Sequence, residues 1–456
     1  MVHKFAQGGL FFVLDINSGA VHMVDEIVYD VLSYYPKESA LTAIRALLDR
    51  YEESEIREAL EEIDALIEAE QLYTDGAYIG EVQLNTRAPV IKALCLHVAH
   101  DCNIRCKYCF ASQGDFNMVR GLMPLEVGKA ALDFLIAHSG NRRNLEVDFF
   151  GGEPLMNFEV VKELVHYGRR IEKEHGKNFR FTITTNGMLL DDDKIDFINE
   201  HMSNAVLSID GRREVNDFMR PTVSGGGTYD VIVDKFRRLV EKRGAKSYYV
   251  RGTYTAHNTD FSKDVKHLAD LGFRSTSVEP VVAKETDAYA LKAEDLPKLL
   301  HEYELLAEEM IQGHEKGKPF DFFHFSVDLS QGPCVVKRLS GCGAGSEYIA
   351  VTPEGDIYPC HQFVGDTDFK LGNVMSGEFE MRESFRDAHI LNKQKCRHCW
   401  AKFYCSGGCH ANAYNFNGDI LEPHEMSCEL EKKRIECSIY IQGRLSEQEA
   451  DDDQSL

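Results

Sequence analysis

Between residues 91 and 315, short runs of apolar and β-branched residues alternate with longer amphipathic stretches. The short runs predict strands, and in order they read IKALCLHV, LEVDFF, FRFTITT, NAVLSID, YYVRGTYT and STSVEPVV. The longer stretches predict helices, for example at 124–138, 157–174, 228–242 and 261–271. Such alternation is typical of an α/β fold with a parallel sheet and crossover helices. Six units predict a partial (β/α)6 barrel over residues 90–320, with its chemistry at the C-terminal ends of the strands.

Residues 1–80 have a different pattern, which predicts a separate module. FFVLDINSGAVHMVDE alternates like a β-hairpin with a turn at Asn17–Gly19. Two amphipathic helices follow, and Ser54 is the predicted N-cap of the second. Their predicted apolar faces are Leu41, Ile44, Leu47, Leu48 and Tyr51, then Ile56, Leu60, Ile63 and Ile67. The module is either a structural cap or a peptide-docking unit that offers an exposed strand edge.

Residues 330–440 are rich in glycine and cysteine and contain few long apolar stretches. A region with so few residues that could form a hydrophobic core is predicted to be stabilised by bound metal. Residues 441–456 form an acidic tail, and its end, SEQEADDDQSL, is predicted to be a disordered solubilising segment.

The composition argues against some classes of protein. A net charge of −23 over 456 residues argues against nucleic-acid binding, although it allows a cationic peptide partner. No apolar run reaches the ~18 residues of a membrane-spanning helix, and the N-terminus lacks a signal sequence. We therefore expect a cytoplasmic protein that is not membrane-bound. Disulfides are disfavoured there, so clustered thiols among its 13 cysteines indicate metal or redox chemistry.

The segment CNIRCKYCF places Cys102, Cys106 and Cys109 directly after the first predicted strand. A structural zinc site is one interpretation, but zinc usually takes four protein ligands. A four-iron cluster held by three thiolates instead keeps one iron open to chelate a ligand.

This C-x3-C-x2-C spacing with a following aromatic residue resembles the radical S-adenosylmethionine superfamily. The resemblance implies that the open iron takes the amino and carboxylate groups of the methionine moiety. Cleavage of the bound cofactor would give a 5′-deoxyadenosyl radical that abstracts a hydrogen atom. In the same way, FFGGEPL resembles the GGE motif that contacts the methionine amine, and Arg220 resembles an arginine that pairs with its carboxylate. The expected cofactor-binding residues are Tyr108, Gly152, Glu153, Thr185, Asn186, Ser208, Asp210 and Arg220. Polar strand ends of this kind are equally common as turn formers.

The C-terminal cysteines resemble the seven-cysteine SPASM pattern, which implies two auxiliary four-iron clusters. By that resemblance one cluster has the ligands Cys396, Cys399, Cys405 and Cys428, and the other has Cys342, Cys360 and Cys409. Cys334 is a possible eighth ligand; without it, one iron is open to a substrate cysteine. Zinc is the alternative, because C-x2-C pairs are also zinc-like.

The N-terminal module resembles the winged-helix-like PqqD-type domain that recognises leader peptides. The stretches HKFAQGGLFFVLDINSGAVHMVDEIVYDVL and GCGAGSEYIAVTPEGDIYPCHQFVGD closely resemble the sactisynthase-like maturases of SCIFF peptides. The resemblance implies an enzyme with three [4Fe-4S] clusters that installs thioether cross-links in a cysteine-rich precursor peptide with a leader. It also implies an external electron donor of the flavodoxin or ferredoxin type. A formylglycine-generating enzyme of the sulfatase-maturing type and a non-catalytic iron–sulfur carrier are the alternatives. No catalytic base stands out, and Glu279 is only a polar group in a predicted barrel strand.

Overall fold

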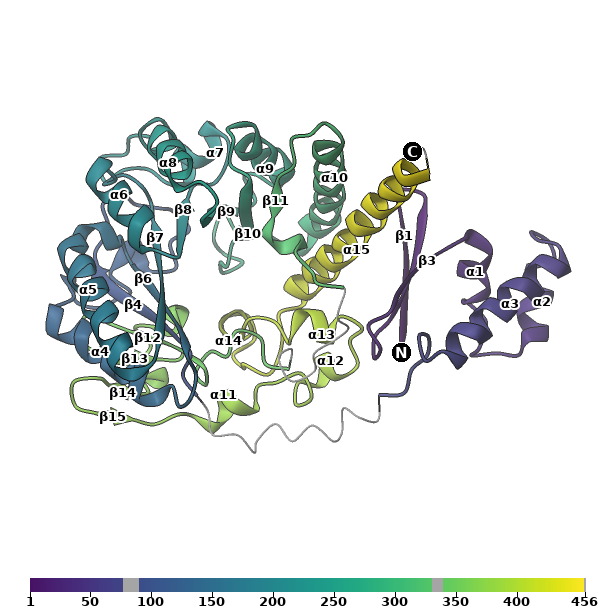
Figure 1. The fold of residues 1–456 in the computed structure, drawn as a ribbon, viewed down its shortest axis with the longest axis horizontal. Helices are drawn as coiled ribbons and strands as arrows, with labels where there is room; N and C mark the ends of the chain where they lie inside the picture. The colour runs from purple at the N-terminus through teal and green to yellow at the C-terminus, as the bar shows by residue number, and fades with distance from the viewer. Residues whose placement is uncertain (77–89, 330–338, 455–456) are drawn as a thin grey trace.

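Figure 1 shows the fold as a computed structural model, which describes residues 1–76, 90–329 and 339–454. The central element is a curved sheet in which the six predicted strands are all present and pair in parallel. They are β4 (Ala93–His100), β6 (Asn144–Gly151), β7 (Asn178–Thr185), β8 (Asn204–Ser208), β9 (Ser247–Tyr254) and β10 (Ser275–Pro280). The partial barrel expected from the alternating pattern is therefore confirmed.

Helices cover the outer face of this sheet (Figure 1). They are α4 (Leu125–His138), α5 (Phe158–His175), α6 (Asp192–His201), α7 (Arg213–Met219), α8 (Tyr229–Arg243), α9 (Phe261–Asp270) and α10 (Leu296–Glu315). Their apolar faces and the alternate strand residues form one continuous buried core. The sheet is extended by the short strand β11 (Asp321–Phe322) beside β10, while β5 (Gly121–Leu122) pairs with β4.

The N-terminal module is a three-stranded antiparallel sheet followed by three helices. Its elements are β1 (Val2–Gln7), β2 (Leu10–Asp15), β3 (Val21–Val24), α1 (Glu26–Val31), α2 (Ala40–Leu47) and α3 (Glu53–Glu68). The predicted hairpin is confirmed as β2–β3. Figure 1 shows the sheet beside the C-terminal helix, with α1–α3 projecting away from the barrel.

Two details of the predicted helices in this module were wrong. Leu41 and Leu48 do not lie on the buried face, since their side chains are 60% and 50% exposed. Ile44 and Leu47 are buried, and Tyr51 packs partly buried against the same cluster. Helix α3 is capped by Glu52, not Ser54, since Glu52 and Glu55 bond reciprocally to each other's backbone in a capping box.

The C-terminal region is built from short elements and one long helix. Its strands are β12 (Tyr348–Val351), β13 (Asp356–Tyr358), β14 (Gly372–Asn373) and β15 (Glu378–Phe379). Its helices are α11 (Glu383–Asp387), α12 (Gln394–Arg397), α13 (Lys402–Cys405), α14 (His410–Asn417) and α15 (Glu425–Gln454). Strand β12 pairs in parallel with β4 of the barrel. The expected boundary between the barrel and the cysteine-rich region is therefore crossed by one continuous sheet.

The expected acidic tail is also different from the prediction, because α15 continues through residue 441 to Gln454. Ile439, Tyr440 and Ile441 are buried, and α15 packs against α10. A helix anchored in this way can extend into the charged segment, which is rich in helix-forming residues. None of the helices in the described ranges is long and apolar enough to cross a membrane.

Candidate functional site

The first cysteine loop follows β4 and is held by backbone contacts with the segment after α7. Arg105 N donates to Pro221 O over 2.8 Å, and Lys107 N donates to Met219 O over 2.9 Å. These bonds fix the backbone on either side of Cys106. The loop therefore has a defined shape before any ligand binds to its thiols.

Gly151 and Gly152, at the end of β6, pack against this loop. A Cβ atom on Gly151 would lie 2.2 Å from Ala99 O, and one on Gly152 would lie 2.1 Å from Asp101 O. Gly152 N also donates to Ala99 O over 2.8 Å. The atoms closest to both glycines belong to the chain itself. The glycines let the end of β6 lie directly beneath the residues that lead into Cys102, and both also line a cavity at the ends of the strands.

Glu153 is completely buried, and its carboxylate accepts three hydrogen bonds from the chain. The donors are Leu155 N at 3.0 Å, Thr185 Oγ1 at 2.7 Å and Asn186 N at 2.8 Å. Burial raises the pKa of Glu153, although these three bonds oppose the shift. Glu153 is not among the cavity-lining residues; it joins the glycine turn to the end of β7, where Thr185 and Asn186 do line the cavity.

Tyr108, Asp210 and Arg220 form a buried network behind the cysteine loop. The Tyr108 hydroxyl donates to Asp210 at 2.7 Å and accepts from Arg220 Nη1 at 2.8 Å. Burial raises the pKa of Asp210 to about 6 in spite of Arg220 and Tyr108, which lower it. Among the described residues, Arg220 Nε has no hydrogen-bond partner although it is buried. One guanidinium N–H is therefore available to an anion in the cavity that Arg220 lines.

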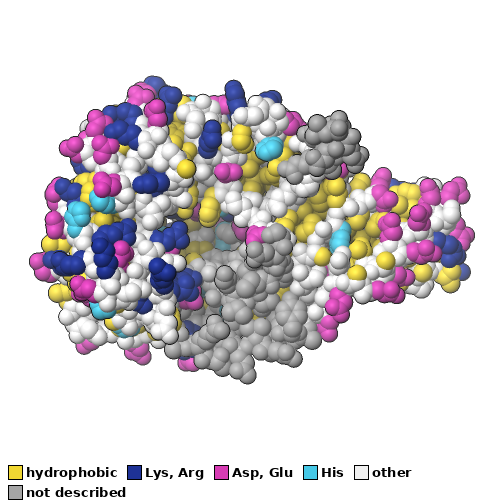
Figure 2. Space-filling model, in the orientation of Figure 1, with side chains coloured by type: hydrophobic (Ala, Val, Ile, Leu, Met, Phe, Trp, Pro, Cys, Tyr) yellow, Lys and Arg dark blue, Asp and Glu magenta, His cyan; other side chains and the backbone are white. Residues whose placement is uncertain are grey.

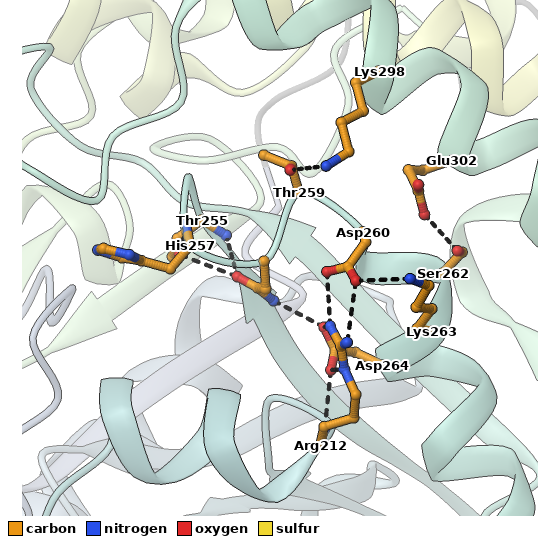
Figure 3. A network of polar contacts seen from close by, with 11 residues as sticks. Arg212, Thr255, His257, Thr259, Asp260, Ser262, Lys263, Asp264, Lys298 and Glu302 are labelled. Atoms are coloured by element: carbon orange, nitrogen blue, oxygen red, sulfur yellow. Dashed lines mark hydrogen bonds and ion pairs between the residues drawn. The ribbon is translucent and has the colours of Figure 1, made fainter.

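A second polar network supports the turn after β8 that carries Asp210 (Figure 3). Arg212 Nε donates to Asp264 Oδ1 at 2.7 Å, and Arg212 Nη2 donates to Asp260 Oδ1 at 2.7 Å. Asp264 is completely buried and also accepts from Asn258 Nδ2 at 3.1 Å. Arg212 thus ties the turn to the start of α9, a positioning role that we did not predict. An arginine directly follows SIDG in the sequence, but the sequence alone does not distinguish this arginine from one that is exposed on the surface.

One cavity joins the predicted residues at the C-terminal ends of the strands. Of the expected residues, it is lined by Cys102, Cys106, Cys109, Tyr108, Gly152, Thr185, Asn186, Ser208 and Arg220. Asp210 and Glu153 lie behind this lining. The cavity is also lined by Arg251 and Glu279, whose side chains form an ion pair at 3.2 Å and which sequence reasoning did not assign to the site. Arg251 holds the pKa of Glu279 at about 2 despite the burial that opposes it.

The far side of the same cavity is lined by His361 and Gln362, which directly follow Cys360. His361 Nδ1 lies 2.9 Å from the hydroxyl of Tyr348, the first residue of the strand that pairs with β4. The parallel pairing of β12 with β4 therefore brings the C-terminal cysteine region up to the first cysteine loop. Sequence reasoning contained no signal for this contact.

The four cysteines expected to form one ligand set lie around a single second pocket. Cys396, Cys399, Cys405 and Cys428 all line it, together with Trp400. Burial raises the pKa of Cys405 to about 12 and that of Cys428 to about 11. These thiols come from α12, α13, the turn between them and the first turn of α15.

Cys342, Cys360 and Cys409 form the other expected set. Cys360 is buried, whereas Cys342 and Cys409 are exposed. Burial is the largest cause that raises the pKa of Cys360. Cys409 and Cys342, when ionised, raise it further, so the three side chains lie close enough to interact electrostatically. Cys334, the possible eighth ligand, lies outside the described residues.

The chemistry of these sites fits iron–sulfur clusters and S-adenosylmethionine. Thiolates are the usual protein ligands of such clusters, and the orphaned Arg220 Nε offers a donor to a carboxylate. Burial raises the pKa of Cys102 to about 11 and that of Cys106 to about 12, so metal binding must displace their protons. Within the described ranges, no three His, Cys, Asp or Glu side chains lie close enough together to hold one metal ion.

Comparisons with known proteins agree with this chemistry. Residues 96–272 match the family model of the radical SAM superfamily, and residues 342–400 match that of the iron–sulfur cluster-binding SPASM domain. A cysteine-type anaerobic sulfatase-maturating enzyme of Clostridium novyi is 23% identical over 335 residues, covering 68% of this chain and 86% of the relative. The radical SAM cyclopropyl synthase TigE of Paramaledivibacter caminithermalis is 22% identical over 464 residues, covering 91% of this chain and 90% of the relative.

A solved structure shares the fold. Native anSMEcpe with bound AdoMet and the Cp18Cys peptide has a TM-score of 0.62 at 20% identity, covering 79% of this chain and 99% of that chain. Residues 96–272 therefore form a radical SAM domain and residues 342–400 a SPASM domain, and the chain is homologous to anaerobic sulfatase maturases and peptide maturases.

Proposed function

We propose that this protein installs intramolecular thioether cross-links in a ribosomally made, cysteine-rich precursor peptide of the SCIFF type. The observation that carries the proposal is the shared cavity, which is lined both by Cys102, Cys106 and Cys109 and by the residues that follow Cys360. A peptide side chain in this cavity would lie between the first cysteine loop and the set of Cys342, Cys360 and Cys409.

In this proposal Cys102, Cys106 and Cys109 hold a [4Fe-4S] cluster, and the two C-terminal sets hold two more. S-adenosylmethionine bound at the first cysteine loop would supply the radical chemistry that removes a hydrogen atom from the acceptor residue. Arg220 would bind the carboxylate of the methionine moiety, while Asp210 and Tyr108 keep its guanidinium in place. Glu153 holds the glycine turn against Asn186 beside the cavity.

The set of Cys342, Cys360 and Cys409 is proposed to hold the thiol of a substrate cysteine. Cys342 and Cys409 are exposed, so a peptide cysteine has access to this site. Formation of one C–S bond takes a hydrogen atom from the acceptor carbon, which would pass to the 5′-deoxyadenosyl group, and a proton from the thiol, which would pass to solvent. The one remaining electron would pass to an auxiliary iron–sulfur cluster. The Cys342→Ala variant should therefore lose cross-linking but still form deoxyadenosine. Wild-type cross-linking by this variant would refute the role.

The N-terminal module is proposed to dock the leader. Strand β3 is an edge of the module's sheet, so an extended peptide could add to it. Helix α3 exposes Glu53, Glu55, Glu58 and Glu61, and Figure 2 shows acidic side chains gathered over this end of the molecule. A leader with basic residues would complement this surface.

The docking test should leave β1 intact, because His3 and Gly8 contact α15. The Met23→Pro variant places a proline in β3, where its ring interferes with an added strand. The leader should then bind more weakly, while deoxyadenosine formation without peptide is unchanged. The matched control is Val119→Pro, at an exposed residue remote from the module. Unchanged leader affinity in Met23→Pro would reject the docking role.

Oxidation of a peptide cysteine to formylglycine is the second candidate, favoured by the similarity to the sulfatase-maturating enzyme of Clostridium novyi. The deciding experiment is anaerobic reconstitution with iron, sulfide, S-adenosylmethionine and a reductant or a flavodoxin-type donor, followed by tandem mass spectrometry of a cysteine-rich precursor. Loss of two hydrogens per bridge, with one thiol consumed, supports the thioether. Loss of the sulfur as formylglycine supports the second candidate. Deoxyadenosine with an unchanged peptide would overturn both.

A further inference from the structure

Lys393 is a completely buried lysine that lies between the two sets of C-terminal cysteines. It is the N-cap residue of α12, three positions before Cys396. Its ammonium donates to Gly407 O over 2.7 Å. Gly407 stands between Cys405 of one set and Cys409 of the other. The side chain therefore ends at the backbone segment that joins the two sets.

The ammonium of Lys393 has no carboxylate partner among the described residues. Burial lowers the pKa of Lys393, and the groups that oppose this shift when they are ionised are four thiols, those of Cys396, Cys405, Cys409 and Cys428. Lys395, two positions away, is exposed and forms an ion pair with Glu422 at 2.7 Å. A buried cation without a counter-charge is costly. The thiols can supply that charge only as thiolates, the form in which they bind a metal.

We propose that Lys393 is the shared counter-charge of the two auxiliary iron–sulfur clusters and that its ammonium raises the reduction potentials of both. This inference rests on the clusters assigned under the proposed function. Reduction adds one negative charge to a cluster, and a nearby cation in a low-dielectric interior favours the more negative state. Because Lys393 faces cysteines of both sets, one substitution should affect both clusters together.

The test replaces Lys393 by methionine, which keeps most of the stem and removes the charge. The triple variant Cys102→Ala, Cys106→Ala and Cys109→Ala serves as the background, so that only the auxiliary clusters contribute. After anaerobic reconstitution, a potentiometric titration followed by electron paramagnetic resonance gives the midpoint potential of each cluster. Both potentials should fall in Lys393→Met, with the reduction equilibrium of each shifted by about tenfold. Lys393→Arg keeps the positive charge, so its midpoint potentials should lie closer to those of the parent.

Lys402 provides the matched control. It is also buried, its ammonium donates to the backbone at Arg397 O, and the thiol that favours its charge is that of Cys399 alone. Lys402→Met should therefore lower the potential of only one cluster.

The outcomes separate this inference from the function on which it rests. Full iron content with both potentials unchanged in Lys393→Met would overturn the role of Lys393. If Lys393→Met holds less iron than the parent, Lys393→Gln decides, because it keeps a donor for Gly407 O without the charge. Unchanged potentials there also overturn the inference, and a fall that Lys393→Arg reverses supports it. A parent protein that binds no iron in the C-terminal sets would instead refute the auxiliary clusters themselves.

Discussion

The first cysteine loop and the C-terminal cysteine region both collect thiols, but they are supported differently. The first loop lies on a parallel sheet with a continuous core, and the backbone around Cys106 is bonded to Pro221 and Met219. The C-terminal thiols lie among short helices, of which α12 and α13 span four residues each. Helices of this length are not stable by themselves.

Buried polar groups without partners occur in both regions. In the described part of the C-terminal region, His389 Nδ1, His410 Nδ1 and Asn412 Oδ1 are buried without hydrogen-bond partners, and Lys393 is buried without a carboxylate. Around the first loop, Glu153 and Asp210 have their carboxylates satisfied by the chain, but His97 Nε2, His100 Nδ1 and Arg220 Nε are likewise buried without partners among the described residues. The two regions therefore differ in how the backbone around their cysteines is supported.

The largest expected effect comes from removing one ligand from each region. Cys405→Ala should destabilise α12 and α13, which would lose protection from hydrogen exchange, because four-residue helices are too short to be stable by themselves. Cys106→Ala should abolish deoxyadenosine formation but leave the protection of β4–β10 unchanged. Hydrogen exchange with mass spectrometry compares both variants with the parent. If the C-terminal region were protected equally in Cys405→Ala and in the parent, the two cysteine regions would not differ in their dependence on bound metal.

Arg212 tests whether the barrel site depends on its own polar supports. Arg212→Ala leaves Asp264 buried and unpaired, which should cost about 3–5 kcal/mol of unfolding free energy. Arg213 is the control, because its pair with Asp230 is exposed on both sides and should contribute about 0–1 kcal/mol. Denaturant unfolding measures both variants. A loss in Arg212→Ala no larger than that in Arg213→Ala would contradict the role of the network in Figure 3.

Arg220 tests the cavity as a cofactor site. Arg220→Lys keeps a positive charge but removes the planar guanidinium, so S-adenosylmethionine should bind about 10- to 100-fold more weakly. Equilibrium binding to the reconstituted protein gives the affinity. Arg251→Lys, at another arginine that lines the cavity, is the comparison and should have a smaller effect on binding. Equal losses in the two variants would contradict the assignment of the carboxylate to Arg220.

The smallest effect is a pH dependence inside the barrel. Burial raises the pKa of Asp148, on β6, to about 7, although Thr184 and Arg251 lower it. A carboxyl with a raised pKa stabilises the fold at low pH, and this contribution is lost as the pH rises from the unfolded value through about 7. Asp148→Asn should therefore flatten the decline in melting temperature between about pH 4 and pH 7. An identical decline in the variant would assign the effect to other groups.

Much of the barrel could be predicted because its signals are local. A strand buried on both faces has a recognisable apolar run, and a helix has its own period. The resemblance to the SPASM pattern implied that Cys396, Cys399, Cys405 and Cys428 belong together, and these four cysteines do line one pocket. The incorrect predictions concern positions whose structure is set by a neighbouring residue or element. Glu52 caps α3 in place of Ser54, and the tail is helical because residues 439–441 are anchored by packing.

Local patterns in the sequence predict the order of the barrel elements, since each strand and helix depends on residues close together in the chain. Only the tertiary structure placed His361 in the cavity, because the pairing of β12 with β4 joins segments about 250 residues apart. It also decided that Gly151 and Gly152 fit against the cysteine loop, and that Lys393 is buried between two groups of thiols. Close approach and desolvation are properties of neighbours in space, and no local pattern encodes them.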